Sequence, residues 1–189
     1  MDKQKSDFQL VKATLEDADN FAHIIAKYEK QLFVYIKRLT NISNDDAEDI
    51  LQEVFIKIYE NLNDFDESLK FSSWIYRIAH NHTISSYRKN KKSSQDISLE
   101  DNEIIYDKLA SELNLHEETD KKLLAAKVKK LLLKLDEKYR EVLILKYLED
   151  KDYTEISNIL KKPMGTIATL MNRAKAVFRK TITENNITF

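Results

Sequence analysis

The sequence predicts an all-α protein of two small helical domains joined by an acidic linker. Its 189 residues include one proline, Pro163, and one glycine, Gly165, which leaves too few turn-forming residues for a β-sheet fold. Apolar residues recur at intervals of three and four along most of the chain, the period of an amphipathic helix. Hydrophobic residues make up 42% of the chain, which is enough for folded domains rather than disorder.

The first half of the chain predicts four helices. A short one covers residues 8–15, and a long one over residues 21–39 has apolar residues at i, i+3, i+4 and i+7. The third, over residues 45–62, begins with a run of acids, where the helix dipole favours negative charge. After the loop NDFDESLK, the fourth covers residues 71–88.

The second half predicts four more helices, over residues 123–135, 138–148, 153–160 and 165–181. The last two form a helix-turn-helix, in which the second helix would lie in the major groove of DNA. The inner face of the first of these two is expected to consist of Glu155, Ile156, Ile159 and Leu160. Pro163 cannot extend that helix, so we expect Gly165 and Thr166 to open the next one.

The last helix has two distinct sides. Its buried stripe is predicted to be Ile167, Met171, Ala174 and Phe178. The opposite side presents Thr169, Asn172, Arg173 and Ala176. Asparagine and arginine can bond base edges in pairs of hydrogen bonds, while Lys161, Lys162, Arg179 and Lys180 are placed for phosphates. An ordinary amphipathic hairpin at the end of the chain is the alternative interpretation.

The net charge of −1 conceals a basic, acidic, basic order. Residues 68–95 contain no acid and carry +6, and residues 156–183 again contain no acid and carry +6. Residues 93–120 have nine acids and one lysine, a net charge of −8. Either basic block alone could be a solvated face, but two helical blocks together favour binding of a polyanion at two places.

Several function classes are excluded by residues that the chain lacks. It has no cysteine, and His23, His80, His82 and His116 are too scattered for a zinc module, so we expect no metal and no cofactor. His80, Asn81 and His82 spell HNH, but consecutive helical residues point about 100° apart and cannot converge on one metal ion. No phosphate-binding glycine loop or nucleophilic triad is readable, so we do not expect an enzyme.

The sequence also predicts where the protein works. Its first 21 residues have no apolar signal-peptide core, and no stretch approaches the roughly 18 apolar residues of a membrane span. We therefore expect a cytoplasmic protein without a membrane span.

Three segments in a fixed order carry a family resemblance: DAEDILQEVFIKIYENL (46–62), FSSWIYRIAHN (71–81) and LDEKYREVLILKYLEDKDYTEISNILKKPMGTIATLMNRAKAVFRK (135–180). With them, nearly the whole chain resembles the extracytoplasmic-function (ECF) group of sigma-70-type RNA polymerase sigma factors. The resemblance implies a sigma-2 domain over residues 1–92, a linker over 93–120 and a sigma-4 domain over 121–189. This matches the division that charge and periodicity already indicate.

The helix over residues 46–62 is, by this resemblance, the one that binds the clamp helices of the polymerase beta-prime subunit. Its implied outward contacts are Asp49, Gln52, Glu53 and Ile56. Ile50, Val54 and Ile58 are expected on the inner face. The acids at its start can serve as helix caps at the same time.

The resemblance further implies that the loop of residues 63–70 captures a flipped base and that the next helix reads the minus-10 element. Extruding a base costs a few kcal/mol, so the protein must supply a pocket for it. The implied residues are Asn63, Phe65, Lys70, Phe71, Tyr76, Arg77, His80, Asn81 and Arg88. Asn81 comes first, because it matches the recurrent asparagine of the family. Trp74 is expected in the core rather than as a stacking platform, whereas Phe71 could serve either way.

For the minus-35 element, the resemblance and the helix faces together indicate Lys161, Lys162, Thr166, Thr169, Asn172, Arg173 and Lys175. Many family members have a basic residue where this chain has Ala168 and Leu170. We therefore expect recognition to depend on Thr169, Asn172 and Arg173, and to be less sensitive to salt than usual, because fewer phosphates are neutralised.

The implied partners are core RNA polymerase, through its beta-prime clamp helices and beta flap, and promoter DNA. An anti-sigma protein that covers the polymerase-binding faces is a further implied partner. In the family the linker passes through the active-centre and RNA-exit channels, where a net charge of −8 could imitate RNA or simply keep a tether soluble. The alternative function is a stand-alone DNA-binding regulator that keeps the sigma-like fold without serving initiation.

Overall fold

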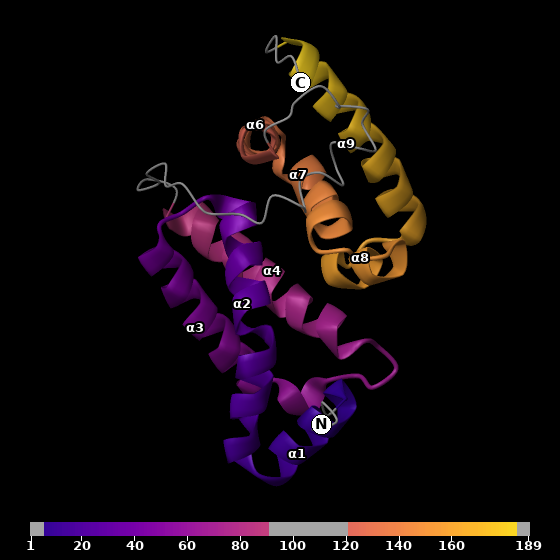
Figure 1. The fold of residues 1–189 in the computed structure, drawn as a ribbon. Helices are drawn as coiled ribbons and strands as arrows, with labels where there is room; N and C mark the ends of the chain where they lie inside the picture. Colours follow the sequence, from indigo (N-terminus) through magenta and orange to yellow (C-terminus); the bar gives the residue numbers. More distant parts are fainter. Residues whose placement is uncertain (1–5, 91–120, 185–189) are drawn as a thin grey trace. The chain divides into compact units, whose positions relative to one another are not determined.

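Two helical units make up the computed structural model, which describes residues 6–90 and 121–184 (Figure 1). The N-terminal unit contains α1 to α4, and the C-terminal unit contains α6, α7, η3 and α9 with most of α8. Every regular element in these ranges is a helix, which confirms the all-α prediction. The predicted acidic linker, over residues 93–120, lies outside the described residues.

The N-terminal unit packs its three long helices, α2, α3 and α4, against one another (Figure 1). Its elements are α1 (Asp7–Glu16), η1 (Ala18–Asn20), α2 (Phe21–Thr40), α3 (Asn44–Glu60), η2 (Leu62–Asp64) and α4 (Phe71–Asn90). The apolar stripe predicted for α2 supplies much of the core, and so does the predicted inner face of α3 (Ile50, Val54 and Ile58). The four predicted helices are confirmed, each to within about two residues at its ends.

A buried lysine fixes the turn between α2 and α3. Lys37 has no exposed surface, and its Nζ donates to the carbonyl of Ile42 and, over 2.9 Å, to Oδ1 of Asn44. The hydroxyl of Ser43 then accepts from the backbone N–H of Asp46 at 3.0 Å and caps α3. Because Lys37 is on α2 and bonds the turn and the first residue of α3, it holds the start of α3 against the end of α2.

The C-terminal unit is built around α9, against which both α6 and α7 pack. Its elements are α6 (Lys121–Lys134), α7 (Glu137–Leu143), η3 (Ile144–Leu148), α8 (Tyr153–Leu160) and α9 (Met164–Glu184). The helix predicted over residues 138–148 is divided into α7 and η3, a π-helical turn. The predicted stripe of Ile167, Met171, Ala174 and Phe178 has no exposed surface, which confirms the inner face of α9.

The turn between α8 and α9 is close to the prediction, with α9 starting one residue earlier than expected. Its left-handed residue is Lys161, with φ 49°, and Gly165 has no positive φ. Helix α9 begins at Met164, where the carbonyl of Pro163 accepts from the N–H of Ile167 at 3.0 Å. At the start of α8, Glu155 caps the helix with Asp152 instead of adding to the inner face.

Replacing Gly165 with alanine is expected to stabilise the C-terminal unit by about 0.5 kcal/mol. No heavy atom lies within 4 Å of a Cβ built on Gly165, and its backbone needs no left-handed conformation. Alanine would therefore fit, and it loses less conformational entropy on folding. Thermal unfolding of the two proteins measures the difference. Ala168→Gly, in the same helix, should shift the unfolding temperature the opposite way, and an equal or lower value for Gly165→Ala would contradict this expectation.

Candidate nucleic-acid interface

An aromatic cluster of Phe65, Phe71 and Trp74 supports the loop between η2 and α4. Phe71 and Trp74 stack with ring centroids 5.6 Å apart, and the ring of Phe65 meets both edge-on at 5.0 and 5.6 Å. Trp74 is only 7% exposed, so its predicted place in the core is confirmed. The loop therefore rests on a rigid apolar base, with Asn63 and Lys70 exposed above it.

The tip of this loop is closed by Asp66. Its carboxylate accepts from the backbone N–H of Ser68 at 2.9 Å, and its carbonyl accepts from the N–H of Leu69 at 3.0 Å. The hydrogen bonds from the side chain and backbone of Ser68 lower the pKa of the Asp66 carboxyl. The loop thus has a defined turn rather than an extended path.

The residues predicted to contact minus-10 DNA divide into exposed and buried groups. Asn81 and Arg88 are exposed on α4, and Arg77 is half-buried. Phe71, Tyr76 and His80 are buried, with 3%, 2% and 7% of their surface exposed. Direct contact between these three and DNA would require them to leave the core, because α4 turns them toward the other helices of the unit.

Tyr35 on α2 explains why two of these side chains point inward. Its hydroxyl lies 3.1 Å from Nδ1 of His80, and its ring centroid lies 4.9 Å from that of Tyr76. The hydrogen bond gives a buried histidine a partner, which lowers the cost of burying it. These residues hold α4 from within, while Asn81 and Arg88 are exposed.

The outer side of α9 carries the residues predicted for the minus-35 element. Thr166, Thr169, Asn172 and Arg173 are all exposed, opposite the buried stripe. At the turn, Lys161 is exposed and Lys162 half-buried. Lys175 is half-buried, with Nζ 5.5 Å from the centroid of the Tyr147 ring. The structure thus places these hydroxyl, amide and guanidinium groups on one exposed helix face, with lysines at its flanks.

A third surface lies on α3, where the four predicted polymerase contacts are exposed. Ile56 is 56% exposed, and Asp49 and Gln52 share its side of the helix. Glu53 is bonded to His82 on α4, with Oε2 and Nε2 2.5 Å apart. The prediction placed Glu53 outward but did not foresee this partner.

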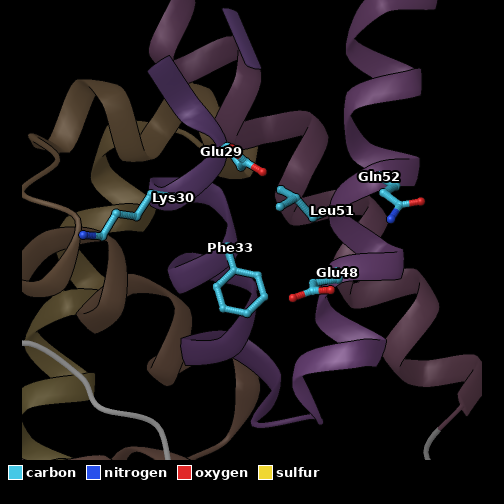
Figure 2. A pocket seen from close by; sticks show the side chains of 6 residues that line it. All are labelled: Glu29, Lys30, Phe33, Glu48, Leu51 and Gln52. Atoms are coloured by element: carbon cyan, nitrogen blue, oxygen red, sulfur yellow. The ribbon is translucent and has the colours of Figure 1, made fainter. Parts of the chain in front are cut away.

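A pocket of about 310 Å³ opens between α2 and α3 beside this surface (Figure 2). Phe33 and Lys30 come from α2, and Leu51 and Gln52 from α3. Glu29 and Glu48 complete the lining, so apolar and acidic side chains share the hollow. Of its six residues only Gln52 was predicted as a site residue.

Comparison with known proteins places both units in one family. The family model described as "Sigma-70 region 2" matches residues 24–93, and "Sigma-70, region 4" matches residues 125–177. The chain is 35% identical over 168 residues to the ECF RNA polymerase sigma factor SigW of Bacillus subtilis, covering 87% of this chain and 89% of the relative. The chain belongs to the ECF group of RNA polymerase sigma factors. Sigma factors are transcription initiation factors and not enzymes.

A second relative is also a sigma factor, and two solved structures have a similar fold. The RNA polymerase sigma-H factor of Pseudomonas aeruginosa is 29% identical, over 95% of each chain. CnrH, solved with the cytosolic domain of CnrY, has a TM-score of 0.66 at 22% identity, covering 93% of this chain and 95% of that one. RpoE of Bartonella quintana, solved with the anti-sigma factor NepR, has a TM-score of 0.64 at 19% identity, covering 87% and 97%. The two structures support the helical fold.

The HNH triplet of the sigma factor does not form a common site. His80 faces Tyr35 in the core, Asn81 is exposed, and His82 reaches Glu53 on α3. Within the described ranges, no three His, Asp or Glu side chains are grouped as a metal site. Nor does any helix in those ranges have the length and apolar character to cross a membrane.

Proposed function

We propose that the sigma factor binds core RNA polymerase through Asp49, Gln52, Glu53 and Ile56. The carrying observation is that Ile56 is 56% exposed on this face, with Tyr59, which is 46% exposed, three residues further along α3. It lies one helical turn from Gln52, which lines the pocket of Figure 2. An exposed apolar side chain beside a hollow is typical of a protein interface. A stand-alone DNA-binding regulator has no need of such a surface.

The minus-10 element is proposed to bind at the loop of residues 63–70 and the outer side of α4. Asn63, Lys70, Asn81 and Arg88 would make the direct contacts, because they are exposed. Phe65 and half-buried Arg77 flank them, and Phe71, Tyr76 and His80 contribute from within. A base flipped from the nontemplate strand would then meet a loop already supported by the aromatic cluster.

The minus-35 element is proposed to bind α9, with Thr169, Asn172 and Arg173 at base edges. Thr169 already donates to the carbonyl of Gly165 at 2.9 Å, so its hydroxyl is left to accept from a base. Lys161, Lys162 and Lys175 would contact phosphates beside Thr166. The absence of acids between residues 156 and 183 supports this proposal.

Arg173→Ala is expected to weaken minus-35-dependent initiation about tenfold and to relax base preference at one position. Arg173 is exposed on the outer face, so its removal should leave the core of the unit intact. Selection of bound DNA from a random library, with the holoenzyme of each variant, measures the change. Lys175→Ala is the control, because loss of a phosphate contact should weaken all sequences equally and reduce the salt dependence. Unchanged selection by Arg173→Ala would contradict the assignment.

The proposed domain boundaries remain a sigma-2 domain over residues 1–92, a linker over 93–120 and a sigma-4 domain over 121–189. The linker is proposed to occupy the polymerase channels until RNA enters them. Because its proposed partners are core polymerase and promoter DNA, the sigma factor is proposed to act in the cytoplasm. This role requires no catalytic activity or cofactor of its own. An anti-sigma protein is proposed as a further partner, covering α3 and its pocket. The structure of RpoE with the anti-sigma factor NepR supports this proposal.

Run-off transcription with purified core polymerase tests this function against the stand-alone regulator. The sigma factor should give promoter-dependent transcripts from a library of upstream sequences, and it should bind core polymerase without DNA. A regulator would instead bind duplex DNA unaided, with useful specificity. The absence of both transcripts and core binding would overturn the proposed function.

A further inference from the structure

A short polar contact joins the helix proposed for polymerase binding to the helix proposed for the minus-10 element. Nε2 of His82 on α4 lies 2.5 Å from Oε2 of Glu53 on α3, and Oγ of Ser86 lies 3.4 Å from the same nitrogen. The side chain of His82 is 13% exposed, whereas that of Glu53 is 61% exposed. His82 is therefore held between the helices, at the edge of the face that carries Glu53.

The position of His82 along α4 gives this contact its importance. His82 directly follows Asn81, the first of the proposed minus-10 contacts. Consecutive side chains on a helix point about 100° apart, so a contact that holds His82 also affects the direction in which Asn81 points. The direction in which Asn81 meets a nucleic acid therefore depends on the partner of its neighbour.

The inner side of α4 is packed by apolar side chains and by the contact between His80 and Tyr35, so the core sets the overall placement of the helix. Oγ of Ser73 and Oγ1 of Thr83 are buried there without a hydrogen bond in the described part of the chain. The bond from His82 adds a polar contact at the flank of the helix, next to Asn81.

We propose that His82 is a positioning residue that, through Glu53, orients α4 relative to the polymerase-binding face of α3. In this way His82 would direct the side chain of Asn81 toward the nontemplate strand when polymerase is bound to α3. The proposal rests on the proposed function of this same site. Glu53 would then serve both as a polymerase contact and, through His82, in promoter opening.

A double-mutant cycle on Glu53→Ala and His82→Ala tests this coupling. Each protein is assayed for affinity to core polymerase without DNA and for promoter opening, measured as permanganate reactivity of nontemplate thymines. Each single variant should lower opening about tenfold, and the double variant should lower it no further. Core affinity of His82→Ala should stay within about twofold of the wild type, because His82 is not one of the proposed polymerase contacts. His82→Gln should restore much of the opening, because its amide can still donate to Glu53.

Glu60→Gln is the matched control, since it also removes one carboxylate from α3, and both readouts should stay within about twofold of the wild type. Additive losses in the cycle would overturn the proposal, and so would a tenfold loss of core affinity in His82→Ala. If His82→Ala unfolds on heating well below the wild type, His82→Gln decides: restored opening at unchanged core affinity supports the proposal, and opening as low as in Glu53→Ala overturns it. A wild type that neither binds core polymerase nor opens promoters would overturn the proposed function itself.

Discussion

Ile56→Asp is expected to lower the affinity of the sigma factor for core RNA polymerase by about 100-fold. In the proposed complex this side chain leaves water, so the variant loses apolar burial and places an unpaired carboxylate in the interface. The two effects together amount to roughly 3 kcal/mol. Fluorescence anisotropy of the labelled sigma factor, titrated with core polymerase, measures the affinity directly.

Leu15→Asp provides a control for Ile56→Asp with the same kind of change. Leu15 is 50% exposed on α1 and outside the proposed interface, so its replacement should leave the affinity within about twofold. Both side chains are already in water, so both variants should unfold near the wild-type temperature. Wild-type affinity in Ile56→Asp would remove α3 as the polymerase-binding helix.

Trp74→Ala is expected to destabilise the N-terminal unit by about 3–5 kcal/mol. The side chain is 7% exposed and packs against both Phe65 and Phe71, so its loss leaves a large cavity under the loop of residues 63–70. This is a large share of the roughly 5–15 kcal/mol that stabilises a typical domain. Urea unfolding, followed by far-ultraviolet circular dichroism, measures the change.

Promoter opening should be more sensitive to Trp74→Ala than core binding is. The loop and Phe65 lose their support, whereas the exposed face of α3 is on another helix. Trp74→Phe keeps an aromatic ring in the cluster and should recover part of both stability and opening. If Trp74→Ala opened promoters as well as the wild type at a temperature where it is folded, the loop would not depend on the aromatic cluster.

Helix positions and their buried faces could be predicted because amphipathic periodicity is a local signal. The stripe of Ile167, Met171, Ala174 and Phe178 follows from helical spacing alone, since the other side of α9 is polar. The inner face of α3 follows in the same way. The residues left outward by these patterns are also those that the family resemblance selects, so the two lines of reasoning agree on both surfaces.

The buried and exposed sides of α4 were harder to predict, because its polar and aromatic residues are compatible with either side of the helix. His80 is buried because Tyr35, 45 residues away, supplies a hydrogen-bond partner, and Glu53 lies 29 residues from His82. Spacing within one helix contains no information about such distant pairs. The turn before α9 shows that the position of a glycine does not by itself locate a left-handed residue, because that conformation falls on Lys161 although Gly165 lies four residues away.

The chemical reactivity of Lys37 can report local unfolding at the junction of α2 and α3. The ammonium group of Lys37 has no exposed surface and is bonded to the turn and to the first residue of α3, so amine-directed reagents cannot reach it while the turn is intact. Exposed lysines on the same unit, such as Lys12 and Lys57, react without any opening. The labelling rate of Lys37, read by mass spectrometry, would therefore follow the opening of the junction between α2 and α3.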